Sequence, residues 1–226
     1  MVGVGNTAEV FDYGDDKVCK LFYEGYPKEA VEREYRNAKE VERLGFSVPK
    51  VFKLVESEGR IGIVYEKIVG KSMLECIFEN PGEADAYLEQ FVRLQKEWLS
   101  CAPEQSASVF SYKVYLHMLI KGAGQEVETS LYDEINALPE GDTLLHGDFH
   151  PGNIMITAEQ RYVVIDFMNV CHGPALYDIV RTYLLLKEKD ETFGRAYLAM
   201  MEVSEGTITV FCSVLEKCRR YEIYGK

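Results

Sequence analysis

Between residues 143 and 167 the chain alternates three short apolar runs with a dense set of acidic, amide and histidine residues. The runs Thr143–Leu145, Asn153–Thr157 and Arg161–Phe167 have the length and the apolar content of strands. The polar turn between the last two runs predicts that they fold together as a hairpin. That hairpin would bring Asn153, at its start, close to Asp166, near its end. The fold of the chain must therefore place these two residues side by side.

One more carboxylate, Asp148, stands in the segment that leads into this hairpin. Asn153 follows Asp148 by five residues, and Asp166 follows it by eighteen. An enzyme that moves a phosphoryl group needs one carboxylate to orient the attacking hydroxyl and oxygen ligands to hold magnesium on the nucleotide phosphates. The spacing supplies such a set of groups: the hairpin brings together two oxygen ligands, Asn153 and Asp166, with Asp148 beside them.

Upstream of residue 70 the chain reads mainly as strands with one helix. Ala8–Tyr13 and Lys17–Tyr23 flank one polar turn, and Lys50–Val55 and Arg60–Ile68 flank another, which predicts two hairpins. A helix is predicted over Pro27–Leu44, between the hairpins, because proline suits a first helical turn and a glycine follows. The predicted buried face of this helix consists of Val31, Tyr35, Ala38 and Val41.

Beyond residue 70 helical periodicity dominates. Ser72 and Glu75 form a capping box at the start of a short helix. Longer helices are predicted over Glu83–Leu99, Val109–Lys121 and Glu126–Leu138, and from Ala175 to the end with interruptions near Asp190 and Gly206. We therefore expect an α+β fold with two lobes: a small N-terminal lobe of antiparallel strands and one helix over residues 1–67, and a larger, mainly helical C-terminal lobe over residues 68–226.

The chain has 226 residues and a net charge of −12, and this composition argues against some classes of partner. A chain this acidic lacks the basic footprint that phosphate backbones need, so we expect no nucleic-acid partner. The N-terminus has no signal-peptide pattern, no apolar run approaches about 20 residues, and the cysteines form no CxxC pair, so we expect a cytoplasmic protein without a membrane partner. The acidic surface either aids solubility or suits a cationic substrate.

The segment His146–Asn153 and the later run Ile165–Phe167 resemble the motifs of a known family. The aminoglycoside phosphotransferase/choline kinase-type enzymes, a branch of the protein-kinase-like fold, have a catalytic loop written HGDxxxxN and a metal motif written IDF or IDW. The resemblance implies a bilobal fold that binds ATP and Mg²⁺. It implies that Asp148 is the catalytic residue, which accepts or orients the proton of the substrate hydroxyl, and that Asn153 and Asp166 bind magnesium.

The resemblance also implies two residues that support this site. His146 would be a buried residue that braces the catalytic loop. Asp178, in the segment His172–Asp178, would brace the same loop through hydrogen bonds rather than react. His150 lies beside the motif and is a candidate contact for the substrate.

A lysine, Lys20, stands within the apolar strand Val18–Phe22. A lysine flanked by core residues needs an anion, which nucleotide phosphates can supply. The following helix offers Glu34 as an acidic partner, with Glu32 as the alternative, and in the family a helix glutamate holds this lysine. On its own, Lys20 would be interpreted as an edge-strand lysine whose ammonium reaches solvent.

Two further segments resemble nucleotide-binding parts of the family. The first is similar to a glycine-rich phosphate loop, whose backbone N–H groups approach oxygens closely, and it contains Gly3, Gly5, Asn6 and Thr7. The family has a strand before this loop, whereas only two residues precede Gly3 here. The second segment contains Glu66 and Ile68, where the family's hinge pairs with adenine, although Glu66 is equally a candidate for a solvated charge.

We therefore predict an ATP-dependent phosphotransferase that transfers the γ-phosphoryl group to a hydroxyl of a small molecule, in the aminoglycoside, amino alcohol or sugar class. Two alternatives stay open. A protein kinase is disfavoured because only eleven residues separate Asp166 from Asp178, which leaves little room for an activation segment, and no APE motif follows. A nucleotide-binding regulatory module without catalysis is disfavoured because the four key positions, Lys20, Asp148, Asn153 and Asp166, all hold competent residues.

Overall fold

The structure is a computed structural model that describes residues 2–101, 109–122, 124 and 126–224. The chain divides into two compact units. The first unit contains Met1–Glu79 and Pro151–Met168, and the second contains Asn80–His150 and Asn169–Lys226. The expected α+β class is confirmed, with an antiparallel sheet in the N-terminal region and mainly helices in the C-terminal region.

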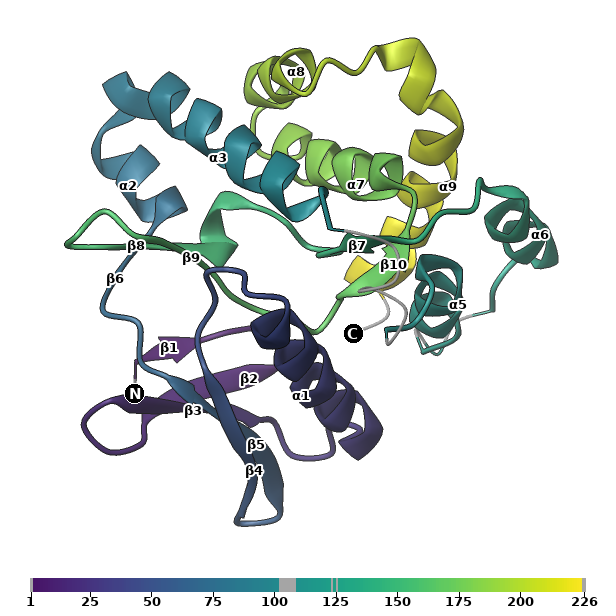
Figure 1. The fold of residues 1–226 in the computed structure, drawn as a ribbon. Helices are drawn as coiled ribbons and strands as arrows, with labels where there is room; N and C mark the ends of the chain where they lie inside the picture. The colour runs from purple at the N-terminus through teal and green to yellow at the C-terminus, as the bar shows by residue number, and fades with distance from the viewer. Residues whose placement is uncertain (1, 102–108, 123, 125, 225–226) are drawn as a thin grey trace. The chain divides into compact units, whose positions relative to one another are not determined.

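Five strands of the described chain form the main antiparallel sheet of the first unit (Figure 1). They lie in the order β1, β2, β3, β5, β4. Their bounds are β1 (Gly3–Val4), β2 (Ala8–Asp12), β3 (Lys17–Phe22), β4 (Val51–Ser57) and β5 (Arg60–Glu66). The two predicted hairpins, β2–β3 and β4–β5, are therefore confirmed, and the pairing of β3 with β5 joins them into one sheet.

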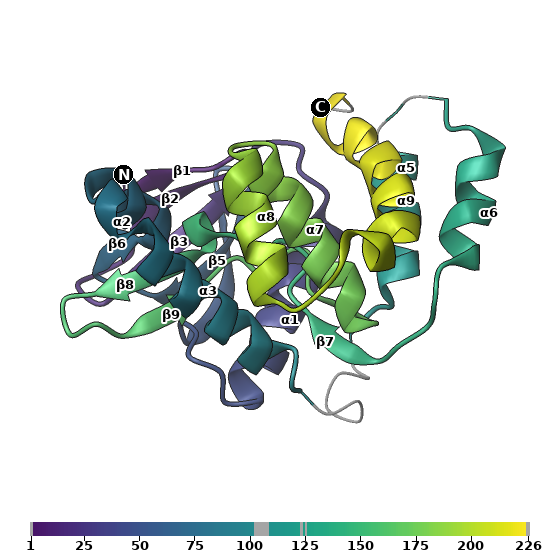
Figure 2. The same cartoon turned by 90° about the horizontal axis from the view of Figure 1, so that it is seen from above.

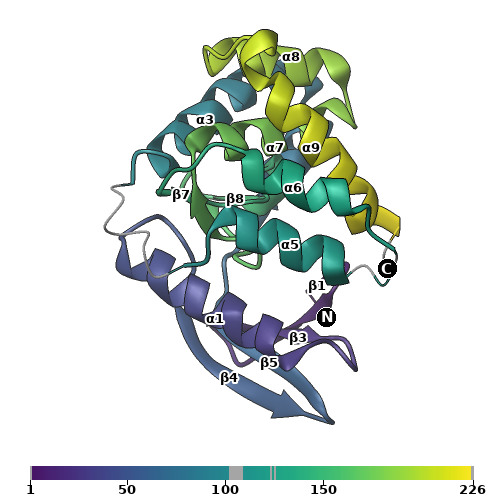
Figure 3. The same ribbon diagram turned by 90° about the vertical axis from the view of Figure 1, so that its right-hand side faces the viewer.

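The helix α1 (Lys28–Arg43) packs against β4 and β5 of this sheet (Figure 3). Its buried face contains Val31, Ala38 and Val41 as predicted, but Tyr35 is only half-buried. Two polar residues, Glu34 and Asn37, complete the buried face instead. The apolar periodicity of the sequence could not reveal them, because it counts only apolar residues toward the face that packs.

A second sheet of the first unit carries the predicted motif hairpin. Its strands lie in the order β6 (Gly70–Ser72), β8 (Ile154–Thr157), β9 (Tyr162–Val164). The hairpin is therefore confirmed, but Asn153 lies in the short 3-10 helix η2 (Pro151–Asn153) before β8, and Asp166 lies beyond β9. Pro151 cannot donate to a strand ladder, which is consistent with the late start of β8.

The strand β6 leads directly into the short helix α2 (Met73–Glu79). The Ser72 backbone N–H donates to Glu75 Oε2 over 2.7 Å, and the Glu75 N–H donates to Ser72 Oγ over 3.2 Å. These reciprocal hydrogen bonds confirm the predicted capping box, and they satisfy two backbone donors at the start of the helix.

The motif hairpin is held within the first unit by hydrogen bonds to its backbone. The Val164 N–H donates to the Ser47 carbonyl over 2.9 Å, and Asn37 Nδ2 donates to the Phe167 carbonyl over 3.0 Å. Residues 68–79 also belong to this unit. The boundaries of the two compact units therefore differ from those of the two lobes expected over residues 1–67 and 68–226. The division into a nucleotide-binding lobe and a catalytic lobe stays a prediction.

The second unit is mainly helical. The 3-10 helix η1 (Pro81–Glu83) precedes the helices α3 (Ala84–Trp98), α5 (Tyr112–Gly122), α6 (Thr129–Ala137), α7 (Ala175–Lys187), α8 (Glu191–Met200) and α9 (Glu205–Tyr224). The helix α7 packs against both α8 and α9 (Figure 2), and α9 also contacts α5 and α6. A two-stranded sheet of β7 (Thr143–Leu145) and β10 (Cys171–Gly173) completes this unit, and β7 contacts α7.

The predicted helices are confirmed, with ends that differ by a few residues. The break expected near Gly206 lies at residues 201–204, before α9. Sequence patterns missed β1, β6 and β10, because strands of two or three residues carry too little periodicity to detect. Within the part of the chain that the structure describes, no helix has the length and apolar character needed to cross a membrane.

The substitution Gly70→Ala is expected to destabilise the first unit. A Cβ at Gly70 would overlap the carbonyl oxygen of Ile156, so the pairing of β6 with β8 would have to shift. We expect the free energy of unfolding, measured by urea denaturation, to fall by about 1–3 kcal/mol, the range for overpacked sites. Gly82→Ala is the matched control, because nothing lies within 4 Å of its Cβ position. An equal loss in both variants would show that the close approach at Gly70 is unimportant.

Candidate functional site

Three charged side chains of the first unit meet at Lys20, in the middle of β3. The Lys20 Nζ lies 2.8 Å from Glu34 Oε1, in α1, and 2.9 Å from Asp166 Oδ1, beyond β9. The hydroxyl of Tyr65, in β5, donates to the same Glu34 oxygen over 3.1 Å. The fold thus brings together three predicted site residues, although Glu34 and Asp166 are 14 and 146 positions away from Lys20 in the sequence.

Of the two glutamates considered in α1, the partner of Lys20 is Glu34. Its side chain is 1% exposed, whereas Glu32 Oε2 lies 3.9 Å from Nη1 of Arg36 and that pair is exposed to solvent. Residues two positions apart on a helix point to different sides. Only one of the two glutamates can therefore face the sheet, and the alternative Glu32 is ruled out as the partner.

Electrostatics keep Lys20 charged. Burial alone would lower the pKa of its ammonium group, because the charged form loses hydration. The carboxylates of Asp166 and Glu34 outweigh this effect and raise the pKa of Lys20 well above its usual range. The Asp166 side chain is 39% exposed, so this cluster of one ammonium and two carboxyl groups is open to a ligand from solvent.

The motif hairpin holds the two predicted metal ligands, Asn153 and Asp166. The Ile165 N–H donates to the Asn153 carbonyl over 2.9 Å, which ties the two ends of the hairpin together. Asp166 has a φ of 69°, a left-handed conformation that costs energy outside glycine and often occurs at functional sites. Asparagine and aspartate offer the oxygen donors that Mg²⁺ prefers, and Mg²⁺ commonly takes one or two protein ligands and completes its shell with phosphate and water. The donor set therefore fits Mg²⁺.

This fit depends on a nucleotide to complete the coordination. Among the residues described, no group of three or more His, Cys, Asp or Glu side chains lies close enough to hold a metal ion without other ligands. A site of two protein ligands is weak alone but suits an ion that arrives with phosphate oxygens. The metal-ligand roles of Asn153 and Asp166 stay predictions.

The glycine-rich segment forms a shorter loop than predicted. Gly3 lies in β1, where it pairs with Val10 of β2, and is therefore not part of the turn. The turn consists of Gly5, Asn6 and Thr7, and the Gly5 N–H donates to the Ala8 carbonyl over 2.8 Å. Sequence reasoning placed Gly3 in the loop because a two-residue strand leaves no alternation to detect.

The two predicted hinge residues, Glu66 and Ile68, lie at and just beyond the end of β5. Glu66 is the last residue of β5, and its Oε2 accepts a hydrogen bond from the Lys50 N–H over 3.1 Å. Ile68 lies in the link between β5 and β6. The Glu66 carboxylate thus has a partner within the unit, while the role of both residues in nucleotide binding stays a prediction.

In the second unit, Asp178 in the first turn of α7 holds the loop that follows β7. Its Oδ1 accepts from the Gly147 N–H over 2.7 Å, and its Oδ2 accepts from the His146 N–H over 3.3 Å. Gly147 has a φ of 76°, and a side chain there would overlap the Asn169 carbonyl, so the position requires glycine. His146 is fully buried, and its Nδ1 accepts from the Asp148 N–H over 3.3 Å. Both predicted supporting residues therefore bond the backbone of this loop.

Sequence reasoning missed a buried polar network behind the same loop. Gln95, in α3, donates to Thr182 Oγ1 over 3.0 Å and accepts from the Tyr197 hydroxyl over 2.7 Å. The Thr182 hydroxyl donates to the Phe149 carbonyl over 2.9 Å. Three helices, α3, α7 and α8, thus hold the loop through hydrogen-bonded buried groups. The polar Gln95 within the apolar face of α3 was the available sequence signal.

Asp148 itself lies between two basic side chains. His150 Nε2 is 3.7 Å from Asp148 Oδ2, and Arg181 Nη2 is 4.0 Å from Asp148 Oδ1. Burial would raise the pKa of Asp148, but the interaction with His150 and the charge of Arg181 outweigh burial and hold this pKa well below its usual range. The Asp148 side chain is 26% exposed, so it is an ionised carboxylate that solvent can reach.

Comparison with known proteins supports the motif analysis. A family model described as the phosphotransferase enzyme family matches residues 2–207. A search of curated protein sequences finds no significant match.

Solved structures of several phosphotransferases share this fold at low sequence identity. The aminoglycoside-3'-phosphotransferase of type VIII aligns with a TM-score of 0.69 and 15% identity, over 96% of this chain and 92% of that one. The choline kinase LicA from Streptococcus pneumoniae aligns with a TM-score of 0.65 and 13% identity, over 100% of this chain and 83% of that one. The aminoglycoside phosphotransferase APH(3'')-Id from Streptomyces rimosus, in complex with ADP and streptomycin, aligns with a TM-score of 0.61 and 11% identity, over 90% of this chain and 86% of that one.

These structural matches confirm the protein-kinase-like fold that the motifs implied. The family model spans nearly the whole chain, including the loop that holds Asp148 and the hairpin that holds Asp166. The chain therefore belongs to the phosphotransferase enzyme family.

Proposed function

We propose that this phosphotransferase transfers the γ-phosphoryl group of ATP to a hydroxyl group of a small molecule, with Mg²⁺ as its cofactor. The observation that carries the proposal is the cluster in which Lys20 contacts both Glu34 and Asp166. Phosphoryl transfer in kinase-like enzymes relies on a strand lysine held by a helix glutamate and on an aspartate that binds the metal. The cluster supplies all three groups in one unit.

Lys20 is proposed to contact the nucleotide phosphates, with Asn153 and Asp166 as ligands of Mg²⁺. When bound, Mg²⁺ would neutralise charge on the phosphates. The backbone of the loop Gly5–Asn6–Thr7 is proposed to approach the phosphates, and the hinge at Glu66 and Ile68 to contact the base. Structural neighbours that contain ADP or AMP-PNP support nucleotide binding.

Asp148 is proposed to orient the acceptor hydroxyl and to accept its proton as the new oxygen–phosphorus bond forms. A carboxylate with a lowered pKa is a weak base, so it does not remove the proton in advance. This property suits a loose transition state, in which the hydroxyl keeps its proton until transfer is well advanced. The low pKa also keeps Asp148 ionised at all physiological pH values.

The acceptor is proposed to be an aminoglycoside, an amino alcohol or a sugar. Structural neighbours include complexes with streptomycin and gentamicin and a choline kinase. Aminoglycosides and choline are cations, and a chain with a net charge of −12 favours their approach. Cys19, Cys171 and Cys218 are buried thiols, which together with the use of ATP supports a cytoplasmic location.

The proposal is tested by magnesium-dependent ADP release against a panel of hydroxylated acceptors. The panel contains aminoglycosides, choline, ethanolamine, homoserine and simple sugars. We expect one acceptor class to raise ADP release well above the rate without acceptor, and EDTA to abolish the increase. Nucleotide binding without stimulation by any acceptor would favour a regulatory module instead.

The substitution Asp148→Asn is expected to lower kcat by about 10²- to 10⁴-fold, the contribution of a positioned base. The affinity for ATP, measured by calorimetry, should stay unchanged, because Asp148 is proposed to act on the acceptor. Asp133→Asn, an exposed position in α6, is the matched control and should leave kcat unchanged. A parallel loss of ATP affinity in Asp148→Asn would contradict the role assigned to this carboxylate.

The substitution Asp166→Asn is expected to act on the metal and the nucleotide. It removes one carboxylate from the Lys20 cluster, so the Mg²⁺ concentration for half-maximal activity should rise by at least roughly tenfold, the scale for disturbed metal sites. The control is Asp16→Asn, since Asp16 pairs with Lys17 at an exposed turn. An unchanged Mg²⁺ dependence would remove Asp166 from the metal site.

A further inference from the structure

The buried arginine Arg181, in α7, contacts the loop of the proposed catalytic residue and has no part in the sequence motifs. Its side chain is 6% exposed. Its Nε donates to the Gly147 carbonyl, and its Nη2 lies 2.6 Å from Glu222 Oε1 and 4.0 Å from Asp148 Oδ1. One guanidinium group therefore binds the loop backbone, stands beside the Asp148 carboxylate and is anchored to α9.

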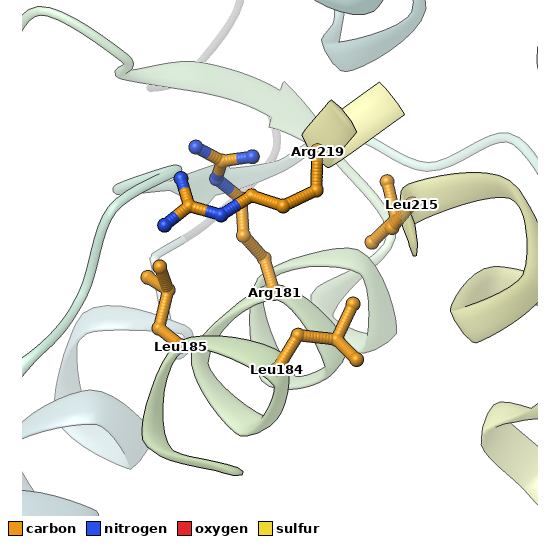
Figure 4. A pocket seen from close by; sticks show the side chains of 5 residues that line it. All are labelled: Arg181, Leu184, Leu185, Leu215 and Arg219. Carbon is orange, nitrogen blue, oxygen red and sulfur yellow. The ribbon is translucent and has the colours of Figure 1, made fainter. Parts of the chain in front are cut away.

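Glu222 holds two arginines at once. Its Oε1 accepts from Arg181, and its Oε2 accepts from Arg219 Nη1 over 2.7 Å. Arg219 also pairs with Glu188 over 3.0 and 3.1 Å. Figure 4 shows Arg181 and Arg219 reaching toward the same place beside a small hollow whose other lining residues are Leu184, Leu185 and Leu215. The Glu222 carboxylate therefore pairs with two guanidinium groups that lie close together.

The physical reason for this arrangement is the cost of burying a charge. A buried guanidinium needs a carboxylate and satisfied N–H groups, and removal of its partner leaves an uncompensated charge. Arg181 has two carboxylates within reach, but it contacts Glu222 closely and stays farther from Asp148. The Glu222 carboxylate, rather than that of Asp148, is therefore the close partner of the Arg181 guanidinium.

We propose that Arg181 is a positioning residue for Asp148, and that Glu222, in the last turn of α9, holds Arg181 in place. This inference rests on the proposed function, in which Asp148 orients the acceptor hydroxyl. Arg181 fixes the loop through the Gly147 carbonyl and sets the field at Asp148, so the end of the C-terminal helix controls the geometry of the base. Other groups near Arg181 are Tyr115 of α5, Tyr177 of α7, Cys171 of β10 and Cys218 of α9. Phenol and thiol groups are neutral at neutral pH, and burial raises the pKa of each of these four further.

The test compares Glu222→Gln and Arg181→Lys with the control Glu188→Gln. Glu188 carries the same carboxyl group and also binds Arg219, but it has no contact with Arg181 among those described. We expect Glu222→Gln and Arg181→Lys to lower kcat for the acceptor found in the panel by about 10- to 100-fold, the effect of a small misplacement of a reacting group. The Kd for ATP should not change, and Glu188→Gln should keep the full kcat.

Two further measurements separate positioning from general destabilisation. In the Asp148→Asn background, Glu222→Gln should cause no additional loss of kcat, because it acts through Asp148. An additive loss would overturn the proposal. Hydrogen exchange of the full chain without substrate should show faster exchange of residues 146–150 in Glu222→Gln, with no change in β3. Unchanged exchange in that loop would also overturn it.

Failure of the positioning role and failure of the proposed function give different results. If no acceptor is phosphorylated by the unmodified protein, the proposed function fails, while the exchange measurement still reports whether Glu222 holds the loop. If the unmodified protein is active and Asp148→Asn is not, but Glu222→Gln and Arg181→Lys both keep full activity, the proposed function stands and the positioning role fails.

Discussion

The first unit is organised around the burial of one ammonium group in a sheet. Burial in the strand β3 disfavours the charged form of Lys20, and the carboxylates of Glu34 and Asp166 outweigh this effect. Glu34 lies on the buried face of α1, and Asp166 ties the end of the motif hairpin to the same point. Because one ammonium group contacts carboxylates from both α1 and the motif hairpin, this cluster constrains strand, helix and hairpin together. The same constraint places an aspartate with oxygen donors next to a cation that can bind phosphate.

In the second unit, the polar groups that need partners are those of a loop backbone. The loop after β7 must expose one carboxylate, Asp148, and it must also keep its own backbone groups satisfied. Asp178 accepts from two backbone N–H groups of the loop, and Thr182 and Arg181 donate to carbonyls on it. A loop held at its backbone can present a side chain in a fixed geometry, which is what catalysis by positioning requires. The helices α3, α7, α8 and α9 therefore hold the loop through hydrogen bonds in addition to packing in the core.

Much of the candidate site could be predicted because the motif residues lie close together in the sequence, where their types and spacing can be read without a structure. The spacing pointed to Asp148 and Asp166, and burial of Lys20 in a strand pointed to an acidic partner in the next helix, now seen as Glu34. The rest depends on tertiary contacts. Arg181 meets Glu222 across 41 positions, and no local pattern links the two. Glu34 and Gln95 escaped the prediction of buried faces because apolar periodicity ignores polar residues that find partners inside. Gly3 was placed in a loop because its strand has only two residues.

The most direct measurement of the central claim is phosphorus NMR of the full chain with ATP, Mg²⁺ and an acceptor that stimulates turnover. We predict a new phosphomonoester resonance that grows as the γ-phosphate resonance of ATP disappears, with coupling to the protons on the acceptor carbon that carried the hydroxyl. That coupling would prove an oxygen–phosphorus bond to the small molecule. Formation of ADP and inorganic phosphate alone, with no ester at any acceptor concentration, would contradict phosphoryl transfer to a hydroxyl and leave only hydrolysis.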